Sequence, residues 1–332
     1  MIFQDRIYGK IKIESPLVLE LVNSPSFQRL REIDQVGYLP LYQKFYPQKI
    51  KKITRFEHSL GVFILLKKFG APFEEQIAGL LHDISHGVFS HALDYVFKEG
   101  SEKNHTFQDN IFEDFIKNSE VPSILSNHDF RFDFILDKTK FPLLEKELPD
   151  LCADRIDYSL RNAICNQEAT KKEIDYFLKN LSVENNLWVF KNFQSAKKYA
   201  KLFYRLNKIY YSAFATAVMF RAVGDVLKHC LERGYLKKED LFLTEKIALK
   251  KIKNKLKSDL KLKILFQRMT GKIKVKEDPK NYDAIVYCKS RIVDPLFKDR
   301  NKIKRLSQVD KNWKKIVKQE LIPKKYFLKF EK

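Results

Sequence analysis

The chain has 332 residues, 44% of them hydrophobic, which is enough for one large core or for a main domain with a smaller appendage. Only 10 Gly and 11 Pro are present and apolar residues recur at helical spacing, so a disordered chain is excluded and a mainly helical one is favoured. The formal charge of +21 favours polyanionic partners, although a lysine-rich solvated surface gives the same net charge.

The N-terminal segment and the cysteines indicate in which cellular compartment the protein is expected. Residues 1–10 contain no apolar stretch typical of a signal peptide, and apolar runs such as 62–66 are too short to cross a bilayer. The cysteines lie far apart without a Cys-x-x-Cys pair, so neither a zinc ribbon nor a disulfide framework is predicted. We therefore expect a cytoplasmic protein with free thiols and no membrane partner.

Helices are predicted along most of the first 235 residues. Ser15-Pro16 and Ser24-Pro25 each place a hydroxyl at an N-cap and Pro at the first helical position. Further helices are expected over 56–69, ended by Gly70, and over 72–83, 101–117, 141–163 and 194–232, with a hairpin around Asn185-Asn186. These elements predict a mainly all-α domain over 1–235.

The composition changes after residue 235. Lysines at 246, 250, 251, 253, 255, 257, 261 and 263 alternate with Ile and Leu, and residues 285–287 and 291–293 predict a small two-stranded element. We therefore expect a small, lysine-rich α+β C-terminal subdomain over 236–332.

Histidines cluster in one part of the chain, where five of the seven lie between His58 and His105. His82 and Asp83 are adjacent in an otherwise apolar segment, 78–84, and burying an ionised Asp without a partner is costly, so a bound cation is its natural partner. His58 lies one helix earlier and Asp154 lies further along the chain. Two imidazoles and two carboxylates suit Mn, Mg, Fe, Ni, Co or Zn.

The order His58, then His82-Asp83, then Asp154 resembles the signature of the HD superfamily of metal-dependent phosphohydrolases. Additional segments are similar to its deoxynucleoside triphosphate triphosphohydrolase branch, which includes the mammalian dNTPase that combines a SAM domain with an HD domain. These segments, all within residues 5–162, are Asp5-x-Ile7-x-Gly9, Phe27-Gln28-Arg29-Leu30-Arg31, Arg55-Phe56-Glu57-His58-Ser59, Ile77-Ala78-Gly79-Leu80-Leu81-His82-Asp83-x-x-His86-Gly87-x-Phe89-Ser90-His91 and Asp154-Arg155-x-Asp157-Tyr158.

The resemblance implies an HD-domain helical fold, a homo-oligomer and the hydrolysis of dNTPs to a deoxynucleoside and triphosphate with a divalent metal. His91 and His105 match positions that supply a proton to the leaving 5′-oxygen, and Asp94, three residues after His91, would orient its imidazole. The positions that match the family's substrate contacts are Arg55, Gln35, Val36, His86, Tyr158 and Asn162.

Two departures from that branch concern the substrate. Asn162 stands where the branch has an Asp that contacts the sugar 3′-hydroxyl. Arg205 is a candidate triphosphate ligand that lies one position away from the best alignment. The sequence therefore predicts a nucleotide substrate without specifying the nucleotide.

Two other interpretations stay open. A phosphodiesterase or phosphomonoesterase acting on nucleotides or cyclic dinucleotides would recruit a second metal through His86, His91 and His105. A nucleic-acid-binding protein with a secondary HD centre would use the lysines of 246–263 against phosphates, and weak nucleic-acid binding is compatible with catalysis.

Overall fold

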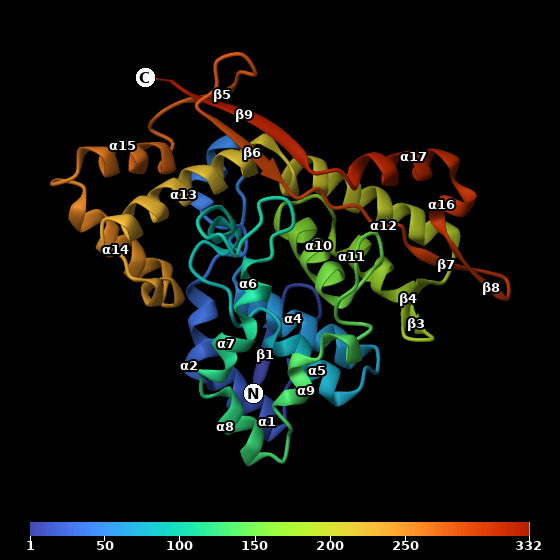
Figure 1. Ribbon diagram of the computed structural model, residues 1–332. Helices are drawn as coiled ribbons and strands as arrows, with labels where there is room; N and C mark the ends of the chain where they lie inside the picture. The colour runs from blue at the N-terminus through green and yellow to red at the C-terminus, as the bar shows by residue number, and fades with distance from the viewer. Residues whose placement is uncertain (332) are drawn as a thin grey trace.

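Helices α4 (Arg55–Lys68) and α5 (Phe73–Leu81) pack against each other in the computed structural model, which describes residues 1–331 (Figure 1). A capping box begins α4, because the Thr54 hydroxyl accepts the Glu57 N–H at 3.2 Å and the Glu57 carboxylate accepts the Thr54 N–H at 3.0 Å. The helix ends before Gly70, whose φ is +72°. The predictions for both helices are confirmed, and α4 carries His58 in its first turn.

A glycine allows α10 (Ala153–Cys165) to lie close against α4. A Cβ at Gly61 would come within 2.0 Å of Arg161 Nη2 and 2.3 Å of Asp157 Oδ2, so no other residue fits without displacing these buried side chains. This close contact between the helices brings the first turn of α10, which contains Asp154, next to His58.

Most other elements are also helical. No helix within residues 1–331 has the length and apolar character needed to cross a membrane. The remaining helices are α1 (Pro16–Asn23), α2 (Pro25–Gln28), η1 (Arg29–Glu32), α3 (Leu39–Tyr42), η2 (Gln43–Phe45), η3 (Ser90–Tyr95), α6 (Phe107–Asn110), α7 (Phe112–Lys117), α8 (Val121–Asn127), α9 (Asp133–Leu136), η4 (Lys138–Lys140), α11 (Lys171–Lys179), α12 (Phe193–Leu206), the π-helical turn η5 (Asn207–Tyr211), α13 (Phe214–Glu232), η6 (Lys238–Phe242), α14 (Glu245–Lys255), α15 (Leu260–Met269), α16 (Leu306–Val309) and α17 (Lys311–Glu320).

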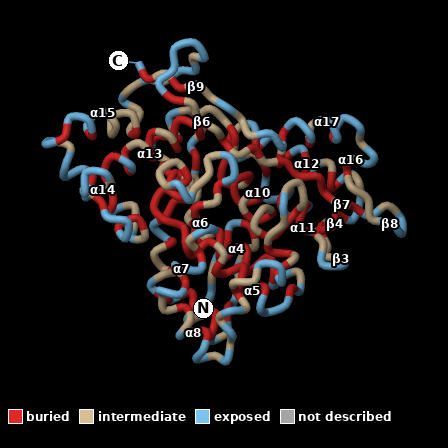
Figure 2. The backbone as a smooth tube through the Cα atoms, in the orientation of Figure 1, coloured by how far each residue is buried: buried red, intermediate tan, exposed pale blue. Residues whose placement is uncertain are grey.

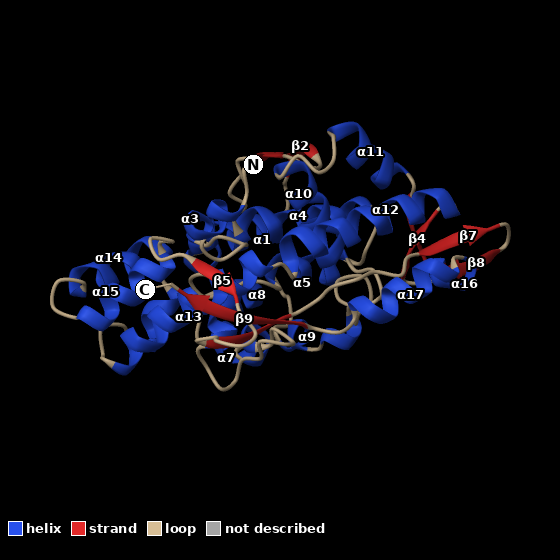
Figure 3. Ribbon diagram, turned by 90° about the horizontal axis from the view of Figure 1, so that it is seen from above, coloured by secondary structure: helices blue, strands red, loops and turns tan. Residues whose placement is uncertain are grey.

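Three small sheets complete the fold among the described residues. The strands are β1 (Ile2–Asp5) and β2 (Gly9–Lys12) in a hairpin, β3 (Leu181–Glu184), β4 (Leu187–Phe190), β7 (Leu296–Asp299) and β8 (Lys302–Arg305) in one sheet, and β5 (Val275–Glu277), β9 (Lys324–Phe330) and β6 (Ala284–Cys288) in another. Figure 3 shows β7 and β8 near one end of α12 and the sheet of β9 beside α13. The predicted hairpin at Asn185-Asn186 is confirmed, with Leu181 opposite Phe190.

The C-terminal residues share a core with the helices before residue 235. One buried apolar cluster contains Ile7, Val223, Val286 and Phe330, and Figure 2 shows buried backbone running continuously through the middle of the molecule. Strand β7 also pairs in parallel with β4, where Phe297 lies opposite Phe190. The boundary at residue 235 stays a prediction, and the lysine-rich part packs directly on the helical part.

Three predicted elements are wrong in part. Residues 141–152 are not helical, because Pro142 and Pro149 interrupt a helix and the Glu75 carboxylate accepts the N–H groups of Leu143 and Leu144. Residues 101–106 are not helical, with a turn at 102–104, and the shorter helices α6 and α7 follow them. Residues 291–293 form no strand, because β6 pairs with β9 instead. The fold is therefore mainly helical, with more strand than was predicted.

Candidate metal centre and active-site cavity

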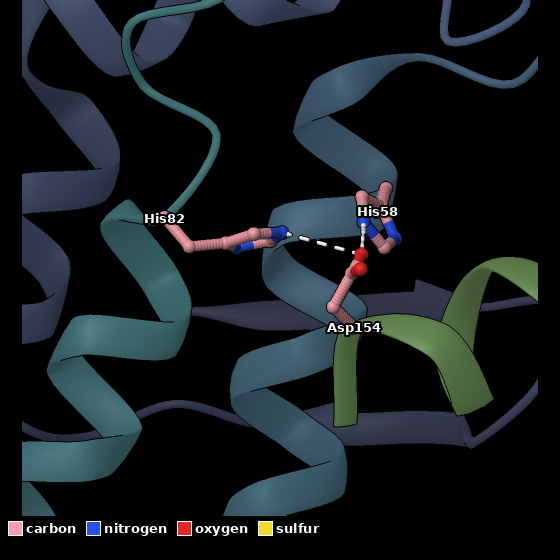
Figure 4. Close-up of side chains that lie close together, drawn as sticks. All are labelled: His58, His82 and Asp154. Atoms are coloured by element: carbon pink, nitrogen blue, oxygen red, sulfur yellow. Dashed lines mark hydrogen bonds and ion pairs between the residues drawn. The ribbon is translucent and has the colours of Figure 1, made fainter. Parts of the chain in front are cut away.

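His58, His82 and Asp154 converge from three helical segments, as Figure 4 shows. Asp154 Oδ1 lies 2.9 Å from His58 Nε2 and 3.6 Å from His82 Nε2. His82 stands at the C-terminal end of α5 and its Nδ1 donates to the Gly79 carbonyl at 2.8 Å, which leaves Nε2 as the nitrogen that is available to a metal. The three predicted ligands therefore point their donor atoms at one another.

Asp83 is the fourth predicted ligand and lies at the edge of this group. Its Oδ1 is 3.6 Å from His82 Nε2, and its Oδ2 is 3.7 Å from His58 Nε2. Arg55 Nη1 donates to Asp83 Oδ2 at 2.7 Å, and His86 Nε2 lies 3.2 Å from Asp83 Oδ1. Asp83 can thus join the metal shell while Arg55 balances part of its charge.

The donor set fits a divalent metal ion. Ligand atoms bonded to one ion at about 2.1 Å lie roughly 3.0–3.5 Å apart, close to the separations seen here. His82 Nε2 is buried without a hydrogen-bond partner among residues 1–331. Such an atom costs stability unless a ligand satisfies it. The geometry and the unsatisfied nitrogen both support a metal at this position.

The electrostatics of the group also favour a cation. Burial lowers the pKa of His82, but the carboxylates of Asp83 and Asp154 outweigh burial and raise this pKa to about 9. Burial raises the pKa of Asp154, but His58 and His82 outweigh it and hold this pKa well below its usual range. The site thus holds carboxylate charge that attracts either protons or a metal ion, and the two compete.

A buried network behind the site orients His58. His58 Nδ1 donates to Asp157 Oδ1 at 2.8 Å, which leaves Nε2 as the nitrogen that faces Asp154. Arg161 donates to both Asp157 oxygens, at 2.9 and 2.8 Å, and also to Asp5 Oδ2 at 2.9 Å. We did not predict a role for Asp157 in orienting His58, although the Asp157-x-x-x-Arg161 spacing on one helix face was a signal for this pair.

The predicted catalytic group forms a second cluster, in which His91 Nδ1 lies 3.1 Å from Asp94 Oδ2. The rings of His91 and His105 are 4.4 Å apart. Burial and His86 hold the pKa of His91 well below its usual range, and burial and His91 do the same for His105. Both imidazoles are therefore neutral near pH 7. The cluster also has donor atoms close enough to hold a metal ion.

A cavity of about 570 Å³ joins the two groups. His82, Asp83 and Asp154 open onto it, as do His91 and His105, whereas His58 and Asp94 are not part of its lining. All the predicted substrate contacts line it, namely Gln35, Val36, Arg55, His86, Tyr158 and Asn162. This volume is typical of a small-molecule site.

Unsatisfied buried polar atoms concentrate in this cavity. Nine of the fourteen buried side-chain polar atoms without a partner in residues 1–331 belong to lining residues. They include Nε2 of His105 and the amide oxygens of Gln35, Gln108 and Asn166. Because buried polar groups are normally hydrogen-bonded, this concentration indicates a place where a polar ligand and water bind.

The cavity also contains cationic side chains that the sequence did not single out. Arg55 and Lys138 pair with Asp83 and Asp109, whereas no carboxylate within residues 1–331 pairs with the other four lining cations, which are Lys146, Arg155, Lys289 and Arg291. Lys289 and Arg291 follow β6, in the lysine-rich part of the chain where nothing local distinguished them.

Arg205, the candidate triphosphate ligand, lies outside this lining. Its Nε pairs with Glu168 Oε2 at 2.9 Å. The cations that face the cavity without a carboxylate partner are therefore other residues than Arg205, which the sequence suggested.

Together, the helical fold and the buried His/Asp cluster at the wall of a polar cavity define a metal-dependent hydrolase site. The family model "HD domain" matches residues 55–162, the segment from the first turn of α4 to α10. The chain is 35% identical to the protein YdhJ of Bacillus subtilis over 306 residues, which are 92% of this chain and 91% of that one. The chain belongs to the HD-domain superfamily of metal-dependent phosphohydrolases.

Other similarities agree with this assignment. The metal-dependent phosphohydrolase cns2 of Cordyceps militaris is 29% identical over 70% of this chain and 67% of its own length. The deoxynucleoside triphosphate triphosphohydrolase SAMHD1 of Mus musculus is 32% identical, but over only 38% of this chain and 21% of its own length. A crystal structure of a Bacteroides thetaiotaomicron phosphohydrolase covers 100% of both chains with a TM-score of 0.74 at 18% identity, which shows a shared fold.

Proposed function

We propose that this phosphohydrolase cleaves dNTPs to a deoxynucleoside and inorganic triphosphate. A single cavity combines the metal-binding side chains with four cations that have no carboxylate partner within residues 1–331. A triphosphate is the nucleotide group whose negative charge best matches that excess of positive charge. The partial similarity to the mammalian triphosphohydrolase supports the same substrate class.

His58, His82, Asp83 and Asp154 would hold the metal. A divalent ion bound there supplies Lewis-acid polarisation of phosphate oxygens and a more acidic water for attack at the α-phosphorus. Arg55 is fixed by Asp83 and by the Ser90 hydroxyl, which accepts from Arg55 Nε at 3.0 Å. Because the Arg55 side chain is already fixed, its remaining N–H groups can bind the α-phosphate without a further loss of conformational entropy.

His91 and His105 would hold the proton that the leaving 5′-oxygen needs. Both are neutral in the free protein, but an anionic triphosphate beside them raises their pKa because it favours the imidazolium. Asp94 keeps the His91 ring in place through Nδ1. The proton thus becomes available when the substrate is bound, which suits a general acid.

The sugar and base would lie against Gln35, Val36, Tyr158 and Asn162. The Asn162 amide donates to the Tyr158 carbonyl at 2.7 Å and leaves its oxygen as an acceptor for a sugar hydroxyl. An amide in place of a carboxylate weakens such a contact, because hydrogen bonds to a charged acceptor are about twice as strong.

Product analysis tests the proposal. Purified protein is incubated with Mn²⁺ and each dNTP and NTP separately, and the products are resolved by anion-exchange chromatography. We expect deoxynucleoside and triphosphate, reduced at least ~100-fold in a His82→Ala, Asp83→Ala double variant. The control is His128→Ala, since His128 lies outside the cavity and pairs with Glu20. If no triphosphate forms from any dNTP, the proposed reaction is wrong.

A second candidate is favoured by the His91, Asp94 and His105 cluster, whose donor atoms lie within 4.8 Å of one another. Two metals in one cavity would suit a phosphodiesterase or phosphomonoesterase. In the same assay this candidate predicts orthophosphate release from nucleoside monophosphates, or opening of cyclic dinucleotides, without any triphosphate product.

A further inference from the structure

The segment between β6 and β7 brings two cations into the cavity from the C-terminal part of the chain. Lys289 Nζ donates to the Asn104 carbonyl at 2.7 Å, and Arg291 Nη2 lies 3.5 Å from His105 Nδ1. Both side chains line the cavity. They therefore stand beside the segment that carries His105, whereas the metal ligands come from α4, α5 and α10.

The backbone of this segment is held rigidly. The Arg291 N–H donates to Asn207 Oδ1 at 2.9 Å, and the Asn207 amide donates to Ser290 Oγ at 3.0 Å and to Glu320 Oε2 at 3.1 Å. Asn207 is fully buried, and Ser290 and Glu320 are 3% and 7% exposed. Asn207 also opens the π-helical turn η5, a feature frequent at functional sites. This arrangement fixes the direction in which Arg291 leaves the backbone.

Lys289 and Arg291 form no ion pair with a carboxylate within residues 1–331, although many other lysines and arginines there do, such as Arg6 with Glu57 and Lys329 with Asp283. Burial and the neighbouring Arg291 lower the pKa of Lys289 to about 8. Two cations held together and partly out of water disfavour each other unless an anion lies between them. The pair thus has the composition of an anion-binding subsite.

We propose that Lys289 and Arg291 bind a phosphate group of the substrate other than the phosphate that is attacked, and that they make the enzyme prefer triphosphates to monophosphates. The attacked phosphate would be placed by the metal ligands and by Arg55, which is held by Asp83 and Ser90 rather than by the segment after β6. The guanidinium of Arg291 offers the planar donor geometry that phosphate oxygens fit. The identity of the substrate rests on the proposed function, whereas the anion subsite does not.

Calorimetric titration of the full chain with inorganic triphosphate and with orthophosphate, both at saturating Mg²⁺, tests the subsite without turnover. We expect Arg291→Gln and Lys289→Gln each to weaken triphosphate binding about tenfold or more, with less than about a twofold effect on orthophosphate. Arg291→Lys should recover part of the loss. The matched control is Lys280→Gln, which removes one exposed positive charge from the same part of the chain.

Unchanged triphosphate binding in both Gln variants overturns the subsite, and an equal loss for triphosphate and orthophosphate overturns its role in the preference for triphosphates. If Arg291→Gln does not fold, Lys289→Gln gives the same comparison. The outcome is separable from the proposed reaction. If the wild-type chain binds triphosphate through these residues but releases none from any dNTP, the proposed function fails and the subsite stands.

Discussion

At the scale of single residues, the metal site depends on a side chain that does not bind the metal. Asp157 is fully buried, accepts from His58 Nδ1, and shares Arg161 with Asp5. A carboxylate in this position fixes the tautomer of a metal-binding histidine and makes its other nitrogen a better ligand. Asp157 Oδ2 also accepts a hydrogen bond from the Tyr8 hydroxyl at 2.9 Å, so the N-terminal hairpin contributes to the same network.

Replacing this carboxylate by an amide should weaken metal binding. We expect Asp157→Asn to lower the affinity for Mn²⁺ by roughly 10- to 100-fold, because the amide neither polarises His58 nor fixes its tautomer as well. Affinity is measured by competition with a chromophoric chelator on protein whose folded state is verified by circular dichroism. Asp114→Asn, an exposed substitution, is the control. Wild-type affinity in folded Asp157→Asn would show that Asp157 has only a structural role.

The metal ligands could be predicted from the sequence, because a His-Asp pair in an apolar segment is buried in any fold and its charge then needs a partner. The supporting residues could not. Arg161 is one of many charged residues on helices, and its importance comes from Asp5, which lies 156 positions earlier in the chain. Lys289 and Arg291 were indistinguishable from the surrounding lysines until the fold placed them in the cavity.

At the scale of elements, local signals predicted most of the helices that carry the site. Apolar spacing located α4 and α5 within a few residues, and Gly70 marked the end of α4. The errors have non-local causes. The N–H groups of Leu143 and Leu144 bond to Glu75 from another helix, and β6 finds its partner in β9, near the end of the chain. The hairpin of β1 and β2 was also missed because its strands are short.

The first residue of α14 connects this C-terminal helix to the loop that follows η1 and to the site. Glu245 Oε1 accepts the Asp34 N–H at 2.8 Å and the Phe89 N–H at 3.4 Å. Burial and the nearby Asp34 carboxylate raise the pKa of Glu245 to about 8. The folded protein therefore keeps a proton that the unfolded chain releases near pH 4.5.

This raised pKa predicts that the free energy of unfolding falls as the pH rises from about 4.5 to 8. The stabilising proton is fully present below about pH 4.5, and its contribution decreases as the pH rises toward 8. Between pH 5 and 8 we expect the free energy of unfolding of the wild type to fall by on the order of 1–3 kcal/mol more than that of Glu245→Gln, measured by urea denaturation. Glu239→Gln, an exposed substitution on η6, should behave like the wild type. Identical pH dependence in wild type and Glu245→Gln would contradict this account.

At the scale of the whole molecule, the cavity is built from distant parts of the chain. Helices of the matched HD segment supply the metal ligands, η5 supplies Tyr210 and Tyr211, and the segment after β6 supplies two cations. Substrate choice is therefore a property of the assembled fold, while the metal chemistry belongs to residues 55–162. The expected homo-oligomer and a nucleic-acid contact through the lysines of 246–263 stay predictions.

We expect one divalent ion to bind at His58, His82, Asp83 and Asp154. Equilibrium dialysis against Mn²⁺, followed by elemental analysis, tests it directly on the wild type and on His82→Ala. We expect one tightly bound ion per wild-type chain and none in the folded variant. An ion retained by His82→Ala with wild-type affinity would contradict the site, and two ions per wild-type chain would contradict the single-metal centre.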